Sequence, residues 1–146
     1  MSSETIFQLC STLALISWIV LIVLSPFWLR VDKFLIAVPI TLLAMVYAWI
    51  IFSGFGAGDV KKFGSLDGVM SLFQNKLLLT AGWVHYLAFD LMTGIWIKRN
   101  ANIHNINYWL IIPVLLFTFM LGPVGLLLYL LIRWIKTKRY FADNFA

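Results

Sequence analysis

The sequence predicts an all-α fold, a four-transmembrane-helix bundle with a short amphipathic interfacial helix between helices 2 and 3. Composition is the first observation: of the 146 residues, 62% are hydrophobic and only 12% are charged, roughly half the charged share of a soluble domain. Four apolar runs are the second, because each has close to the ~20 residues that a helix needs to cross a bilayer. They lie at residues 6–24, 34–53, 77–97 and 108–132. The length suits a single integral membrane domain, residues 1–146.

The first run is followed by a tight connection. Pro26 ends the helix, and Phe27 and Trp28 suit the membrane interface. No positive charge precedes the run and no small-residue cleavage site follows it, so we do not expect a cleaved signal peptide. The second run carries Pro39 near its start, where a missing N–H costs least.

The segment 54–76 is the longest connection. Phe63, Leu66, Met70 and Phe73 recur there at helical spacing, which predicts a short amphipathic helix on the membrane surface or over the end of the bundle. Two roles stay open: an interfacial anchor, or a lid for a lipid-like ligand.

The fourth run contains a helix breaker. The sequence GPVG begins at residue 122, and a glycine–proline step frees a backbone carbonyl and kinks a helix. The kink serves packing, or it widens a cavity opposite the third run, or both.

The net charge of +5 is interpreted as membrane topology. Four spans place both termini on one side, and that side then holds seven Lys and Arg residues against four on the other. The seven are Lys61, Lys62, Lys76, Arg133, Lys136, Lys138 and Arg139, and the four are Arg30, Lys33, Lys98 and Arg99. This bias favours a multi-pass protein with both termini cytoplasmic. No nucleic-acid partner is expected, and the single Cys10 excludes an internal disulfide.

The third run carries His85 and Asp90 near its middle. An ionised carboxylate at that depth is costly, so Asp90 must be neutral, paired or facing a polar cavity. Arg133 is predicted near the membrane surface opposite to the one that Asp90 is closer to. No other cation is expected at the depth of Asp90. A buried ion pair is therefore not expected.

His85 and Asp90 lie about 140° apart around a helix, so they converge only from neighbouring stripes. Burial disfavours the charged form of both, which suits a general acid and a general base. We therefore predict them as catalytic residues, with interhelical hydrogen bonding as the alternative. The predicted substrate-binding residues are Trp83, Tyr86, Phe89, Gly94, Gly122 and Pro123. No metal site is expected, because most need three or more protein ligands.

Three motifs carry a family resemblance: W-x-H-Y-L-A-x-D-L-x-x-G (83–94), G-P-x-G-L-L (122–127) with Arg133 beyond it, and F-x-S-L-x-G-V-x-x-L-F (63–73). The chain resembles the plant neoxanthin synthase family, the abscisic-acid-deficiency-four type of plastid membrane protein, which has small bacterial and algal relatives of unknown function. The resemblance extends over all four runs.

The resemblance implies conversion of violaxanthin to neoxanthin, in which a 5,6-epoxide opens and a neighbouring vinylic proton is lost. The products are an allene and a tertiary alcohol, without redox change, so no cofactor is expected. One proton donor and one acceptor suffice, and His85 and Asp90 would supply them. The chain lacks the long N-terminal extension of a plastid protein, which favours a bacterial inner membrane and a different carotenoid or isoprenoid.

The leading hypothesis is a cofactor-independent carotenoid isomerase in the membrane. The alternative is a non-catalytic accessory protein that binds a carotenoid or another long apolar lipid. A proton-relaying transporter ranks last, because paired broken helices are missing. The expected partners are such a lipid and the bilayer itself, and the sequence also allows a homo-oligomer.

Overall fold

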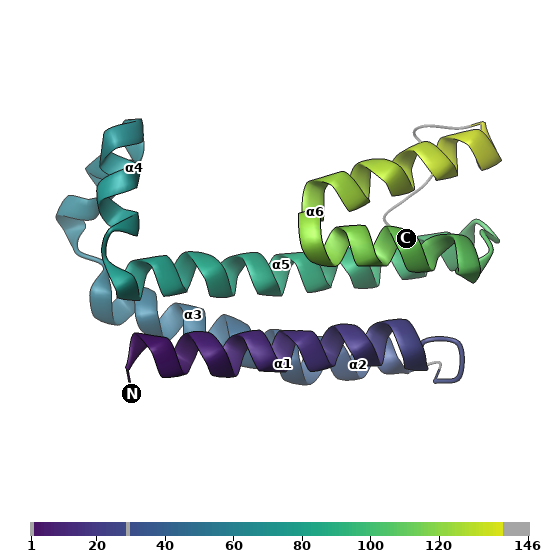
Figure 1. Cartoon of the computed structure of the whole chain (residues 1–146), viewed down its shortest axis with the longest axis horizontal. Helices are drawn as coiled ribbons and strands as arrows, with labels where there is room; N and C mark the ends of the chain where they lie inside the picture. The colour runs from purple at the N-terminus through teal and green to yellow at the C-terminus, as the bar shows by residue number, and fades with distance from the viewer. Residues whose placement is uncertain (1, 29, 139–146) are drawn as a thin grey trace.

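The computed structural model of the chain describes residues 2–28 and 30–138, and these form helices running mostly along one long axis (Figure 1). Within those residues there is no β-strand, which confirms the all-α prediction. The elements are α1 (Ser3–Leu24), α2 (Val31–Leu35), a π-helical turn η1 (Ile36–Ile40), α3 (Thr41–Gly54), a 3₁₀ helix η2 (Ala57–Gly64), α4 (Leu66–Phe73), α5 (Lys76–Ile103) and α6 (Tyr108–Thr137).

Polar side chains set the start of the three longest helices. Ser2, Asn75 and Asn107 each accept a backbone N–H from the first turn of α1, α5 and α6, respectively. Such caps satisfy donors that the first turn of a helix leaves unpaired.

The second hydrophobic segment is one continuous helical stretch, from Val31 to Gly54. It begins earlier than the predicted residue 34, so Pro39 lies inside it rather than at its start. Proline cannot donate to the preceding turn, and the helix widens there into a π-helical turn. The Thr41 hydroxyl donates to the carbonyl of Ile36 at 2.9 Å, which satisfies one acceptor of that turn.

The core lies around α5, which packs against α1, α3 and α6. One half of the core, with Trp18, Leu91 and Leu115, joins α5 to α1 and α6. The other half, with Leu43 and Val84, joins it to α1 and α3. Because α5 packs against three helices, polar residues on its inner face, such as Lys98 and Asn100, are buried against these neighbours rather than exposed to lipid.

Three segments are long and apolar enough to cross a membrane: Ser3–Leu24, Val31–Gly54 and Tyr108–Thr137. The helix α5 is not among them, because residues such as His85 and Asp90 lower its mean hydropathy. With 28 residues it extends about 42 Å, which exceeds the ~30 Å hydrocarbon core. It runs beside α1 over the length of the bundle (Figure 1).

The predicted break in the last segment is present, but it is sharper than a kink. Leu121 has non-helical dihedral angles (φ −141°, ψ 51°), directly before Gly122 and Pro123. The second half of α6 then turns back alongside the first (Figure 1). Gly122 packs against Asp90 in the middle of α5, whereas Arg133 hydrogen-bonds to Asn100 near the end of α5.

The helix α6 is therefore a hairpin that enters and leaves at the same end of the bundle. Its halves, residues 108–120 and 122–137, are about 20 and 24 Å long, shorter than the hydrocarbon core. A single straight fourth span over residues 108–132 does not describe this geometry.

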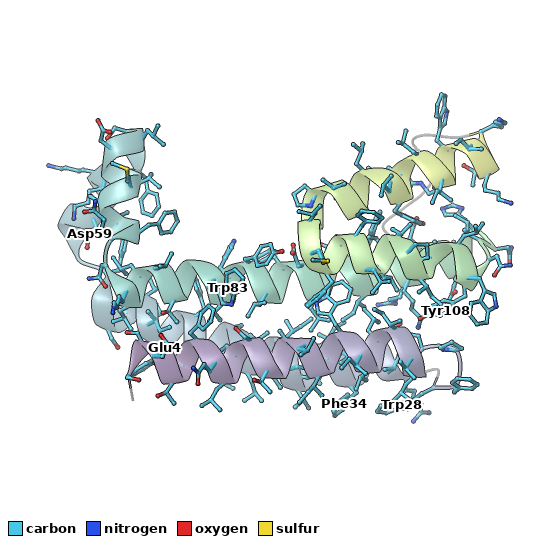
Figure 2. The ribbon with its side chains drawn as sticks, in the orientation of Figure 1. Glu4, Trp28, Phe34, Asp59, Trp83 and Tyr108 are labelled. Carbon is cyan, nitrogen blue, oxygen red and sulfur yellow. The ribbon has the colours of Figure 1, made fainter. Side chains whose placement is uncertain are left out.

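The hairpin also changes which charges lie together. Ser2 and Glu4 lie near Lys76, whereas the second half of α6 ends beside Asn100. Glu4 and Tyr108 mark these two opposite ends in Figure 2. The prediction that Arg133 lies at the N-terminal end is wrong, because the chain reverses before reaching it. Lys136 and Lys138 follow it to the same end as Lys98, and Arg139 lies outside the described residues.

A short amphipathic helix does lie between α3 and α5. This helix, α4, stands across the direction of α5 rather than along it (Figure 1). Leu72 is buried and Leu66 and Met70 are exposed, which fits a helix lying on an apolar surface. Gly68 allows the close turn before it, because a Cβ there would collide with the backbone of Lys62.

Candidate functional site

Asp90 projects from α5 against the break in α6. A Cβ at Gly122 would contact all three terminal atoms of the Asp90 carboxyl group, with Cγ at 2.8 Å and Oδ2 at 2.9 Å. Only glycine therefore leaves room for the carboxyl group there. The Oδ2 atom is buried and has no hydrogen-bond partner among the described residues.

Tyr86 lies one helical turn before Asp90 and faces the same break. Its hydroxyl lies 3.4 Å from the carbonyl of Phe119 and 3.3 Å from that of Met120, and donates there. The Phe119 carbonyl is available because Pro123 has no N–H to donate to it. The Tyr86 hydroxyl is also within interaction range of the Asp90 carboxyl group, although its hydrogen bonds go to the carbonyls.

The break brings together the C-terminal end of one helical half and the N-terminal end of the other, which carry partial charges of opposite sign. The first half of α6 ends near Met120, whose carbonyl accepts from the Tyr86 hydroxyl, and the second half begins at Gly122, against which the Asp90 carboxyl group packs. The start of a helix carries partial positive charge, so it favours a nearby carboxylate. The ion pairs of the described chain, Asp59–Lys62 and Asp32–Lys98, do not involve Asp90.

His85 lies on a different side of α5. The side chain is exposed, not buried as predicted, and its ring makes tilted contacts with Phe89 (centroids 4.5 Å apart) and with Tyr47 of α3 (5.5 Å). It lines a cavity of about 270 Å³ between α3, α4 and α5. His85 thus faces α3 and α4, while Asp90 faces α6, so the structure does not bring the predicted acid and base to one cavity.

A second, larger cavity of about 650 Å³ lies at the N-terminal end of the bundle. Trp83 forms part of its wall, and its ring centroid lies 5.3 Å from that of Phe7 and 5.5 Å from that of Tyr86. The Trp83 indole N–H donates to the Ser11 hydroxyl at 2.9 Å, which fixes the ring. A row of aromatic rings therefore leads from this cavity to Asp90.

The remaining predicted binding residues have different surroundings. Gly94 faces Trp18 of α1, where a Cβ would lie 2.5 Å from the ring, so Gly94 serves helix packing. Phe89 is exposed, and its ring contacts that of His85. Pro123 is exposed beside the break.

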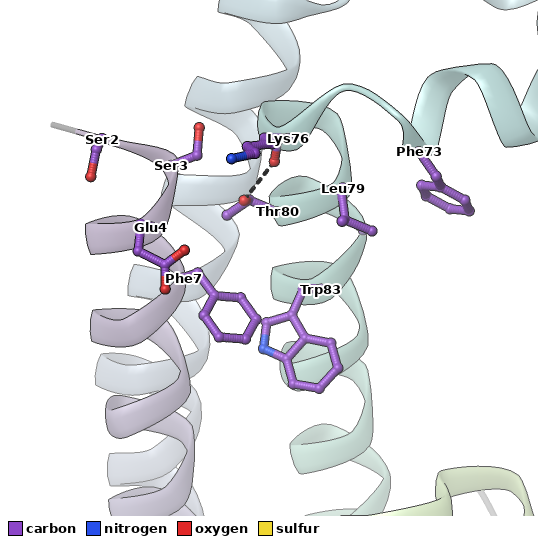
Figure 3. Close-up of a pocket in the computed structure, with 10 residues that line it drawn as sticks. Ser2, Ser3, Glu4, Phe7, Phe73, Lys76, Leu79, Thr80 and Trp83 are labelled. Atoms are coloured by element: carbon purple, nitrogen blue, oxygen red, sulfur yellow. Dashed lines mark hydrogen bonds between the residues drawn. The ribbon is translucent and has the colours of Figure 1, made fainter.

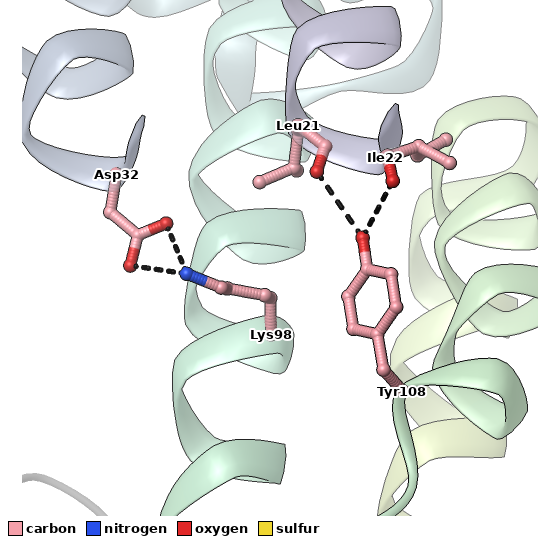
Figure 4. Close-up of polar contacts among 5 residues, drawn as sticks. All are labelled: Leu21, Ile22, Asp32, Lys98 and Tyr108. Atoms are coloured by element: carbon pink, nitrogen blue, oxygen red, sulfur yellow. Dashed lines mark hydrogen bonds and ion pairs between the residues drawn. The ribbon is translucent and has the colours of Figure 1, made fainter. Parts of the chain in front are cut away.

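A polar cluster at the other end of the bundle was not predicted. The Lys98 ammonium contacts both carboxylate oxygens of Asp32, at 2.9 and 3.0 Å, and both side chains are largely buried (Figure 4). Nearby, the Tyr108 hydroxyl donates to the carbonyls of Leu21 and Ile22 at the end of α1. The ion pair between Asp32 and Lys98 could not be predicted, because Asp32 was expected in a connecting loop, where a buried side chain is not anticipated.

Asn100 forms the centre of a second part of this cluster. Its side-chain oxygen accepts hydrogen bonds from the Tyr129 hydroxyl at 2.5 Å and from the Arg133 guanidinium at 3.1 Å. All three side chains are buried. The contact among these three residues could not be predicted from the sequence pattern. It forms only because α6 reverses direction.

These features define a helical membrane protein whose central helix carries a tyrosine and an aspartate against a broken helix. A family model described as ABA DEFICIENT 4-like matches residues 5–129, and the chain belongs to this family. The resemblance inferred from the motifs is thereby confirmed, and the match includes both α5 and the break. Comparison with curated proteins and with solved structures found no match.

Proposed function

We propose that this protein is a membrane isomerase that acts on a carotenoid or related isoprenoid by proton transfer at Asp90. The observation that carries the proposal is the Asp90 carboxyl group at the α6 break, with one buried oxygen free of hydrogen bonds. An aromatic row beside it suits a long apolar substrate. Membership of the ABA DEFICIENT 4-like family supports the substrate class.

The proposed chemistry is epoxide opening to an allene. A base removes the vinylic proton, and the C–H electron pair forms the second double bond of the allene. The neighbouring C–O bond of the epoxide breaks, and the oxygen, still held by the other carbon, takes up a proton. One proton is lost and one is gained, so the reaction is a cofactor-free isomerisation.

Asp90 is the proposed base and Tyr86 the proposed proton donor. Asp90 lies at the start of the second half of α6, whose partial positive charge offsets part of the cost of a buried carboxylate. A phenol is a stronger acid than the alcohol that forms, so transfer from Tyr86 to the epoxide oxygen runs downhill. Because the two side chains are within interaction range, the proton can return from Asp90 to Tyr86 after each turnover. This pairing replaces His85 as the donor.

The test is turnover in membranes that contain an epoxy-carotenoid, with the products separated by chromatography. Asp90→Asn and Tyr86→Phe should each lower the rate about 10²- to 10⁴-fold, while Asp67→Asn, an exposed acid on α4, should not. Full activity of a folded Asp90→Asn variant would refute the proposal. Loss of activity in His85→Gln without loss of activity in Tyr86→Phe would restore His85 as the catalytic partner of Asp90.

The alternative is an accessory protein that binds a carotenoid without converting it. The contacts favour it in one respect: the Tyr86 hydroxyl already meets the α6 carbonyls, and Gly122 packs on Asp90. Both residues could then hold the hairpin in place. Purified protein that carries pigment and never converts it would support this function.

We further propose that the end of the bundle holding Asn100 faces the cytoplasm of a bacterial inner membrane. The described Lys and Arg residues number seven at that end and three at the N-terminal end. The seven are Arg30, Lys33, Lys98, Arg99, Arg133, Lys136 and Lys138, and the three are Lys61, Lys62 and Lys76. Because loops rich in Lys and Arg stay inside, the N-terminus would lie outside.

Cysteine labelling tests this orientation. In a Cys10→Ser background, a membrane-impermeant maleimide should label Ser2→Cys in intact cells. It should label Lys138→Cys only after the membrane is permeabilised. Labelling of both positions from the same side would contradict the hairpin.

A further inference from the structure

The larger cavity is lined by both polar and apolar side chains. Figure 3 shows Ser3, Lys76 and Thr80 near one end, and Phe7 and Trp83 further along the helices, toward the middle of the bundle. A cavity of about 650 Å³ falls within the ~300–1,000 Å³ range of sites that hold small molecules. Its shape and lining suit one end of an amphipathic molecule.

We propose that this cavity binds the uncharged, hydroxyl-bearing end of the substrate that lies farther from the reacting bond. The assignment rests on the proposed function and adds a specificity-determining subsite to it. Glu4 and Lys76 both line the cavity and carry opposite charges. A hydroxyl group can donate to the carboxylate and accept from the ammonium group, whereas an anion or a cation is attracted by one of the two and repelled by the other.

The route from this subsite to Asp90 is continuous along α5. Trp83, Tyr86 and Asp90 follow each other at spacings of three and four residues, so they share one stripe of the helix. Ring centroids 5.3 and 5.5 Å apart link Phe7, Trp83 and Tyr86 along it. A rigid polyene lying on these rings would reach the carboxyl group with its other end.

The helix fixes the length of such a ligand. From Thr80 to Asp90 the rise is about 15 Å, and from Lys76 to Asp90 about 21 Å. The cavity therefore selects molecules whose reacting bond lies about 15–21 Å from a distant hydroxyl-bearing end. A molecule whose polar group and reactive bond lie at the same short end cannot occupy both places.

Pigment binding tests the subsite separately from turnover. The protein would be incorporated in lipid nanodiscs with zeaxanthin, which has a hydroxyl at each end, or with β-carotene, which has none. Pigment retained per protein would then be measured by absorbance. Wild type should retain about tenfold more zeaxanthin, the factor expected for one hydrogen bond to a charged group.

Two matched variants locate the binding site. Leu79 lines the cavity and is 50% exposed, and Leu116 on α6 lies away from it and is 49% exposed. Leu79→Trp should reduce zeaxanthin retention to the β-carotene level, and Leu116→Trp should leave it unchanged. Glu4→Gln should lower it without affecting β-carotene.

The outcomes separate this inference from the proposed function. Equal retention of both pigments by the wild type, or unchanged retention by Leu79→Trp, would overturn the subsite. So would a phospholipid that co-purifies with wild type and is lost in Leu79→Trp while pigment stays. Asp90→Asn should keep full retention while losing turnover, so activity in that variant would overturn the proposed function and leave the subsite standing.

Discussion

Gly122→Ala tests the contact between α5 and the break in α6. The added methyl group would lie 2.8 Å from Cγ and 2.9 Å from Oδ2 of Asp90, whereas unstrained carbon contacts lie at about 3.5–4.0 Å. Overpacking of this kind costs about 1–3 kcal/mol. Gly122 has no positive φ, so alanine fits the backbone and should regain about 0.4–1 kcal/mol. The net loss of unfolding free energy should be about 1–2 kcal/mol.

A double-mutant cycle shows whether that loss comes from Asp90. In an Asp90→Ala background the carboxyl group is gone, so Gly122→Ala should be neutral or stabilising, with a coupling energy of about 1–2 kcal/mol. Unfolding in detergent micelles, followed by circular dichroism, measures the unfolding free energy of each variant in the cycle. Gly64→Ala is the control, because a Cβ there would have nothing within 4 Å. An equal loss in both backgrounds would refute the contact.

Three further predictions concern the polar contacts of the bundle. Lys98→Met leaves the buried Asp32 carboxylate unpaired and should cost about 3–5 kcal/mol of unfolding free energy. Much of this loss should be regained when Asp32→Leu is added. Losses of the two single variants that simply add up in the double variant would contradict a buried pair. Tyr129→Phe removes a buried hydroxyl donor and should cost about 1 kcal/mol; a cost near zero would contradict that bond. The ion pair with Lys62 holds the pKa of Asp59 below its usual range. The pair therefore stabilises the fold at pH values above the pKa of Asp59 in the unfolded chain, and this stabilisation is lost as the pH falls through the lower pKa of the folded chain. Lys62→Ala should raise that pKa in an NMR titration, and an unchanged value would contradict the pairing.

Local signals predicted most of the helices. Apolar runs predicted α1 and α3, and the amphipathic spacing predicted α4 from Leu66 to Phe73, whereas Phe63 of the same pattern lies in the separate helix η2. The glycine–proline step correctly placed the break in α6. It could not give the direction of the chain after the break, because a kink and a reversal have the same local sequence. The direction depends on contacts with α5, such as that between Asn100 and Arg133.

The candidate site was predicted in part. Helical periodicity placed Trp83, Tyr86 and Asp90 on one stripe, and the structure brings that stripe to Gly122. Periodicity gives the angle between two side chains of one helix but not which neighbour each one meets. His85 was therefore paired with Asp90, although His85 lines the cavity beside α3 and α4 while Asp90 lies against α6.

The hairpin form of α6 bears on how the protein is assembled. Both ends of the hairpin lie at one face of the bundle, where Trp109 and Trp134 are exposed and suited to the same lipid interface. The hairpin can therefore fold as one unit and dock sideways on α5, without either half passing between the other helices.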